Sequence, residues 1–287
     1  MPFFYLSSLL FMFFFGLTGS NGVGEENSGR ATVALRSSVR WIGPEQTFYL
    51  IVVVVPDDGW HIYWKNPGDS GMPTEFEVTA PEDFVIGDPI YPRPSIFDGE
   101  EGVTFGYKEE AAFFIPVKAP SEIQISPADF SVTTTWLSCK KNCVLGEVKN
   151  ICSIQTNIAA SGPEYKDLSF LRWQNLLPKP FPNLKGWEID ATTQVLQITG
   201  EIISPSDTEL NIQFLPELGS SVSGIKLKNT EPIQNARANF KLAIPLDIDS
   251  NAANENNGLI AKGLLIFGNK RTDPSYVVQA VIDSKSN

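Results

Sequence analysis

Trp136-Leu-Ser-Cys139-Lys-Lys-Asn-Cys143 contains two of the three cysteines of the chain, and three residues separate them. In one extended strand their Cα atoms would lie roughly 13 Å apart, which is too far for a disulfide. In a helix the two positions would be neighbours. The flanks favour a third arrangement, a β-hairpin, because residues 131–137 are rich in β-branched and aromatic side chains and apolar residues alternate again along residues 148–158.

A hairpin with the three-residue loop Lys140-Lys-Asn142 would place Asn142 in the left-handed conformation that asparagine tolerates. It would also place Cys139 opposite Cys143, with Cβ atoms roughly 4.5–5.5 Å apart, close enough to bridge after small adjustments. A disulfide that closes so short a loop adds little stability, because it removes little chain entropy. Two adjacent lysines would also favour the reactive thiolate. The tip is therefore predicted to exchange disulfides, with a static structural disulfide and a metal site as open alternatives.

Cys152, the third cysteine, is predicted to be a buried and unreactive thiol. It shares strand parity with Ile154 and Ile158, and no charged residue adjoins it in the sequence to stabilise a thiolate. The alternative is a resolving role in the redox chemistry of the other two cysteines.

The composition argues against several function classes. With 22 Lys and Arg against 33 Asp and Glu, the chain carries a net charge of −11 and shows no basic patch, so neither nucleic acid nor an anionic membrane surface is an expected partner. Its 21 prolines and 22 glycines are typical of a turn-rich β protein.

The amino terminus is predicted to be an export signal. Residues 3–15 form a mostly apolar run with the length of a signal-peptide core, too short for an easy membrane crossing. An uncleaved amino-terminal anchor is the alternative, and a lipoprotein anchor is excluded because no cysteine lies near residue 20. Export would place the protein in an oxidising compartment, where disulfides persist.

From residue 30 onward, the patterns predict an all-β protein of two immunoglobulin-like β-sandwich domains joined by a short helical, Pro-rich connector. The expected division is a signal peptide and linker at 1–29, a first sandwich with the cysteine pair at 30–160, the connector at 161–185 and a second sandwich at 186–287. The buried stripe of the connector helix is expected to consist of Tyr165, Leu168, Leu171 and Leu176.

Strands are expected at 31–42, 46–55, 60–64, 74–78, 111–117, 122–125, 131–137 and 148–158, and in the second domain at 187–189, 195–203, 209–215, 224–228, 238–244, 259–267 and 276–282. The stretch 89–107, rich in Pro, Gly and Phe, is expected to be a long irregular segment of the kind that often carries function.

The cysteine segment resembles the amino-terminal periplasmic domain of DsbD-type thiol:disulfide interchange proteins, especially the ScsB-like branch. The family signature Trp-Leu-x-Cys-x-x-x-Cys-x-x-Gly is matched by Trp136, Leu137, Cys139, Cys143 and Gly146. One departure is Leu145, where the family is expected to carry proline.

Two further blocks carry the resemblance upstream. Gly59-Trp-His-Ile-Tyr63-Trp-Lys-Asn-Pro-Gly-Asp69-Ser-Gly-Met-Pro73 matches the family pattern Gly-Trp-His-x-Tyr-Trp-x-Asn-Pro-Gly-Asp-Ser-Gly-x-Pro. Phe105-Gly-Tyr107 is similar to the family's Tyr-Gly-Tyr stretch. Together the matches extend over roughly residues 30–160, in the order of the family.

The resemblance implies a redox domain that passes reducing equivalents to thioredoxin-like exported proteins through Cys139 and Cys143 as the catalytic pair, with Cys143 forming the mixed disulfide. It implies neither a metal nor a small-molecule cofactor. It also implies proton-handling roles for Tyr63 and Asp69, whose alternatives are core packing and turn capping. The printed sequence holds neither the family's membrane domain nor its thioredoxin domain, so a separately encoded membrane electron donor is expected.

The resemblance further implies that Phe105 and Tyr107 form an aromatic flap over the cysteines, with an ordinary hairpin turn as the alternative. Two rival functions stay open. One is a binding module with a structural disulfide. The other is a copper-handling protein that uses Cys139, Cys143 and His61, because copper prefers soft thiolate ligands. His61 is otherwise expected to be a partly exposed strand residue.

Overall fold

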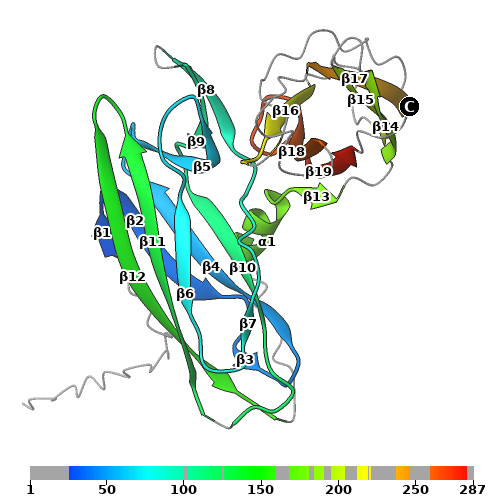
Figure 1. Cartoon of the computed structure of the whole chain (residues 1–287). Helices are drawn as coiled ribbons and strands as arrows, with labels where there is room; N and C mark the ends of the chain where they lie inside the picture. Colours follow the sequence, from blue (N-terminus) through cyan, green and yellow to red (C-terminus); the bar gives the residue numbers. More distant parts are fainter. Residues whose placement is uncertain are drawn as a thin grey trace, which may run out of the picture.

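The described part of the chain is built from β-strands and one helix, as the sequence predicted (Figure 1). The computed structural model describes residues 26–99, 102–124, 126–158, 168–180, 184–190, 195–203, 212–218, 220, 237–245 and 259–282. The predicted export signal lies outside these residues.

The first half of the chain forms two sheets. One sheet has the order β1 (Glu26–Ser28), β2 (Ala31–Ser37), β4 (Thr47–Pro56), β10 (Ala111–Lys118) and β7 (Val85–Ile86). The other has the order β3 (Trp41–Ile42), β12 (Cys143–Thr156), β11 (Ala128–Cys139), β5 (His61–Gly68), β9 (Gly102–Tyr107) and β8 (Ser95–Gly99), and β6 (Glu75–Thr79) also pairs with β11.

The core lies between these two sheets, and alternation along each strand determines which side chains enter it. In β11, every second residue from Ala128 to Ser138 is buried, and Phe130, Val132 and Trp136 belong to the main apolar cluster. The opposite sheet contributes Phe48, Leu50 and Phe113 to the same cluster. Rings from the two sheets meet edge to face, as in Phe48 and Phe130, whose centroids are 5.7 Å apart.

Strand β4 is buried on both faces, because helix α1 (Leu168–Asn175) covers the side that faces away from the core. Phe170 and Trp173 of α1 form a second apolar cluster with side chains of β4 and β10. The predicted helical stripe is wrong at Leu168, which is 86% exposed, and at Leu171, which is also exposed. The helix turns its two large aromatic rings to the sheet instead, and these bury more apolar surface than the leucines would.

The second half of the chain contains two smaller sheets. One has the order β13 (Lys179–Pro180), β19 (Ser275–Ile282), β18 (Leu259–Phe267) and β16 (Ile212–Pro216), and the other has the order β14 (Leu184–Asp190), β15 (Val195–Ile203) and β17 (Arg237–Pro245). Each of these strands from β14 to β19 corresponds to a predicted one. The strand predicted at 224–228 lies outside the described residues.

Buried contacts join the two halves. Arg93 is buried, and its guanidinium donates hydrogen bonds to the backbone carbonyls of Phe267, Gly268 and Asp273 at 2.7–2.9 Å. Glu217 forms ion pairs with Lys65 at 2.5 Å and with Lys262 at 3.2 Å. Leu215, Leu264 and Ile266 are part of the same buried apolar cluster as the first two sheets.

Three predictions about the first half are wrong. The single strand predicted at 31–42 is divided, because β2 ends at Ser37 and β3 belongs to the other sheet. Residues 122–124 do not form a strand. The stretch 89–107, predicted to be irregular, contains the hairpin of β8 and β9, in which Gly99 pairs with Gly102. Its many Pro and Gly residues hid the alternating pattern that identifies short strands.

Candidate functional site

The two cysteines of the motif lie opposite each other in a regular hairpin of β11 and β12, as predicted. They form a disulfide, with their Cα atoms 4.2 Å apart. The loop of residues 140–142 closes with a hydrogen bond of 3.2 Å from the Lys140 N–H to the Asn142 carbonyl. The predicted left-handed conformation of Asn142 is wrong, because this turn closes without a positive φ at that residue.

Trp136 and Gly146 fix the position of this hairpin on the core. They face each other in register, and a Cβ on Gly146 would lie 2.3 Å from the ring of Trp136, so only glycine leaves room for the buried indole. The indole N–H donates to the carbonyl of Gly29 at 3.2 Å and to the hydroxyl of Ser138 at 3.1 Å. The Trp and the Gly of the signature are therefore two halves of one packing contact.

The disulfide lies on the outer face of its sheet, not in the core. Trp136 and Ser138 point inward on β11, so Cys139, at the opposite parity, points outward. Cys143 on β12 likewise shares the parity of the exposed residues of its strand. The two cysteines of the disulfide nevertheless differ in solvent access, since Cys139 is 5% exposed and Cys143 is exposed.

An aromatic cluster lies next to Cys139 on this outer face. His61 of β5 is the residue opposite Cys139 on the side away from Cys143, at a Cα separation expected to be about 5.5 Å. The His61 ring packs against Tyr63 at 5.0 Å and against Phe97 of β8 at 5.2 Å between centroids. Cys139 therefore has His61 of β5 as its neighbour in the ladder, and Phe97 of β8 packs on the far side of that histidine ring.

The surroundings of His61 favour its neutral form. Burial, and then the positive charge of Lys108, lower the pKa of His61 below its ordinary value. The Lys108 ammonium lies 4.3 Å from the centre of the Phe97 ring, a cation–π contact. Lys140 turns away from the loop, because its ammonium donates to the carbonyl of Asp58 at 3.1 Å.

The predicted supporting residues have separate positions. Tyr63 is buried beside His61, on the same face as the disulfide. Asp69 anchors a turn, since its carboxylate accepts a hydrogen bond of 2.7 Å from the N–H of Val103, and its own N–H donates to the Val103 carbonyl at 2.9 Å. For Asp69, the structure therefore shows the turn-capping contacts that were the alternative to a proton-handling role.

Phe105 and Tyr107 do not form a flap. Both point into the core, where Phe105 packs on Trp64 at 6.3 Å and Tyr107 packs on Phe113 at 5.4 Å. Strand alternation explains the error, because Tyr107 pairs with the core residue Ile62. The aromatic residue that the sequence reasoning missed is Phe97, whose partner in the ladder places it on the outer face. Its only signal was its place in the unusual stretch 89–107.

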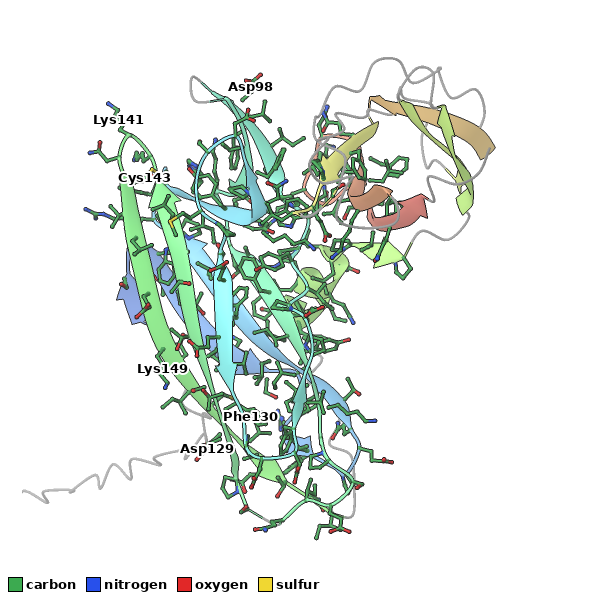
Figure 2. The ribbon with its side chains drawn as sticks, viewed as in Figure 1. Asp98, Asp129, Phe130, Lys141, Cys143 and Lys149 are labelled. Carbon is green, nitrogen blue, oxygen red and sulfur yellow. A yellow bond between two sulfur atoms is a disulfide. The ribbon has the colours of Figure 1, made fainter. Side chains whose placement is uncertain are left out.

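A hollow of about 240 Å³ adjoins Phe97 on the surface, lined by Ser95, Phe97, Tyr107, Lys108, Glu109 and Arg271. Figure 2 shows Cys143 and Lys141 near the tip of the β11–β12 hairpin and Asp98 near the tip of β8, at the same end of the molecule. This end of the protein therefore combines the disulfide, a cluster of rings and open space.

Cys152 lies on the opposite face of β12 and packs against the main core cluster. Burial, and then the negative charge of Asp129, raise the pKa of its thiol to about 11. The side chain is therefore a packed, protonated thiol at neutral pH. In the described ranges, no group of three or more His, Cys, Asp or Glu side chains is arranged to hold a metal ion.

Comparison with known proteins agrees with this geometry. The N-terminal family of the thiol:disulfide interchange protein DsbD matches residues 32–152. The crystal structure of the N-terminal periplasmic domain of ScsB from Proteus mirabilis has 17% sequence identity, a TM-score of 0.55, and a match that covers 88% of this chain and 94% of that chain. At this identity the likeness concerns the fold. A search of curated proteins finds no match.

Proposed function

Because residues 32–152 match the N-terminal family of the thiol:disulfide interchange protein DsbD, we propose that this protein passes reducing equivalents to thioredoxin-like exported partners through Cys139 and Cys143. The observation that carries the proposal is the unequal exposure of the two sulfur-bearing residues in one outward-facing hairpin disulfide. The exposed Cys143 can attack a partner's disulfide, and the enclosed Cys139 then resolves the mixed disulfide.

The reaction begins with both cysteines reduced. The thiolate of Cys143 attacks one sulfur of the partner's disulfide, a bond forms between the two proteins, and the partner's other sulfur leaves as a thiolate that takes up a proton. The thiolate of Cys139 then attacks the sulfur of Cys143. The intramolecular disulfide forms, the partner leaves with two thiols, and two electrons have passed to it.

His61 and Phe97 are proposed to govern the second cysteine. The imidazole opposite Cys139 is proposed to take up the thiol proton only in passing, because its lowered pKa makes it release that proton readily to solvent. Phe97 takes the shielding role first expected of Phe105 and Tyr107, because its ring lies on His61. The hollow beside Phe97 gives the ring room to swing away when a partner arrives.

The location, the electron donor and the domain organisation are proposals of the same kind. We place the protein in the periplasm, exported by its amino-terminal segment, with a separately encoded membrane protein as electron donor. Helix α1, the one helix in the described ranges, lacks the length and apolar character of a membrane span. We also propose that residues 186–287 form a second immunoglobulin-like sandwich beyond the connector at 161–185, docked on the first through Arg93 and Glu217.

Trapping of the mixed disulfide tests the proposed function. The Cys139→Ala variant should accumulate a covalent complex with an oxidised thioredoxin-like protein, because the resolving thiol is absent, and Cys143→Ala should form none. Cys152→Ala is the control and should exchange at nearly the wild-type rate.

If Cys143→Ala traps the partner and Cys139→Ala does not, Cys139 attacks the partner and Cys143 resolves the mixed disulfide. If neither variant traps a partner, and the wild-type disulfide has a reduction potential below roughly −300 mV, the static binding module is the correct function.

A further inference from the structure

Strand β8, which carries Phe97, is joined to its sheet at one edge only. It is the last strand of that sheet and, within the described ranges, it pairs with β9 alone. The pairing of β9 with β5 is itself interrupted after Tyr63 and resumes only at Gly68, the last residue of β5, which pairs with Thr104. In the ladder, the outer part of the β8–β9 hairpin therefore meets β5 only at the end of that strand.

Asp69, the next residue of the chain, reinforces this attachment. Its N–H donates a hydrogen bond of 2.9 Å to the carbonyl of Val103, and its carboxylate accepts one of 2.7 Å from the N–H of the same residue. A hydrogen bond to an ionised carboxylate is stronger than one between neutral groups. Val103 precedes Thr104, the ladder partner of Phe97. Asp69 thus binds both backbone groups of a residue next to the one that pairs with Phe97.

The hairpin is shaped to receive this carboxylate. Gly102 has a φ of 99°, a conformation that favours glycine, and a Cβ at this position would collide with the carboxylate of Asp69. Gly99, which pairs with Gly102 across the hairpin, is different, because a Cβ added there would have no atom within 4 Å. The contact with Asp69 therefore requires glycine on one strand of the hairpin and not on the other.

The placement of the hairpin determines where the Phe97 ring lies. That ring packs on His61 with 5.2 Å between centroids, and the ammonium of Lys108 lies 4.3 Å from its centre. His61 is in turn the ladder neighbour of Cys139 on β11. A displaced β8–β9 hairpin would uncover the imidazole beside Cys139, while the β11–β12 hairpin with its disulfide would stay in place.

We propose that Asp69 is a positioning residue for the exchange reaction: its carboxylate fixes the β8–β9 hairpin so that Phe97 lies on the imidazole beside Cys139. The inference rests on the proposed function, in which Phe97 shields this imidazole. It gives Asp69 a role without proton transfer, because accepting a hydrogen bond from a backbone N–H requires an oxygen atom and no change of protonation. An asparagine can supply the same acceptor, which makes the role testable.

The first test compares Asp69→Ala with Asp69→Asn in the full oxidised chain. Both variants remove the charge, and only asparagine keeps the acceptor. His61 is the only histidine of the sequence, so its NMR signals report on this position directly. Asp69→Ala should shift these signals and raise the pKa of His61 toward its ordinary value, because the ring loses the cover of Phe97. Asp69→Asn should keep the wild-type signals and pKa.

Alkylation of Cys139 is the second readout. In a reduced protein that also carries Cys143→Ala, Asp69→Ala should raise the rate of reaction of Cys139 with iodoacetamide roughly three- to tenfold, the effect of one lost hydrogen bond, and Asp69→Asn should not. Phe97→Ala should raise the rate by a similar factor. Adding Asp69→Ala to Phe97→Ala should then have no further effect, because Asp69 acts through that ring.

Gly102→Ala breaks the same contact from the hairpin side and leaves Asp69 in place, so the test does not depend on the folding of one variant. It should reproduce the His61 signals of Asp69→Ala, whereas Gly99→Ala, the matched control, should resemble the wild type. Unchanged His61 signals in both Asp69→Ala and Gly102→Ala would overturn the inference. So would an Asp69→Asn variant that behaves like Asp69→Ala, because the charge and not the anchor would then be required.

The proposed function fails separately from this inference. A wild-type chain that does not reduce purified oxidised thioredoxin would refute the function, whereas the His61 signals and the alkylation rates of Cys139 would still show whether Asp69 positions Phe97.

Discussion

Cys143 and Cys152 lie in one strand, nine residues apart, and their environments are opposite. The odd separation places them on different faces of the sheet. Cys143 is exposed in an outward-facing disulfide, whereas Cys152 packs against the core and its thiol has a pKa raised to about 11. The comparison teaches that the face of the strand, more than the neighbouring sequence, determines whether a cysteine of this protein can react.

The largest expected effect is on thiol reactivity. In the reduced protein at pH 7.5, Cys152 should react with iodoacetamide at least about 300-fold more slowly than Cys143, because an exposed thiol has an ordinary pKa of about 8.5. Mass spectrometry of digested samples can follow each cysteine separately. In urea the two rates should converge, and comparable rates in the folded protein would refute the contrast.

The second prediction concerns the core-facing side of β12 near the tip. Gly146→Ala should lower the free energy of unfolding by about 1–3 kcal/mol, because its new methyl group would press on the buried ring of Trp136. Urea denaturation measures the change. Gly99→Ala is the matched control, since no atom lies within 4 Å of the Cβ it would add, and it should alter stability by no more than about 0.5 kcal/mol.

The smallest expected effect concerns His61 on the outer face. Its lowered pKa means that the unfolded chain binds the proton more tightly than the folded protein does. Stability should therefore fall as the pH drops below about 6.5, toward the lower pKa of the folded state, and this contribution should vanish above that pH. His61→Gln should lack this contribution. The urea midpoint should therefore fall more between pH 7.5 and pH 5.5 in the wild type than in the variant. Parallel pH profiles would show that His61 is not enclosed.

Patterns that depend on neighbours in the sequence were predictable. The β-branched residues before Cys139 and the spacing of the cysteines led to the correct hairpin and disulfide. The family motif also became interpretable, since Trp136 and Gly146 meet across the ladder. The enclosure of Cys139 had only a weak signal in the sequence, namely its position at the end of a predicted strand.

Features that depend on strand order were not predictable. Phe97 reaches the site only because β8 follows β9 and β9 follows β5 in the sheet, an order that no local pattern specifies. Phe105 and Tyr107 were assigned to the wrong face because the register of β9 against β5 was unknown. The buried face of α1 was predicted wrongly because the spacing of its leucines does not show that Phe170 and Trp173 pack against the sheet.

The buried guanidinium of Arg93 limits how this protein can be divided for experiments. Its bound carbonyls belong to Phe267, Gly268 and Asp273, so a fragment that ends near residue 160 would keep the charge and lose the groups that satisfy it. The same cut would uncover the apolar surface that packs against Leu215, Leu264 and Ile266. A shortened redox domain is therefore expected to be less soluble and less stable than the whole chain unless Arg93 is replaced at the same time.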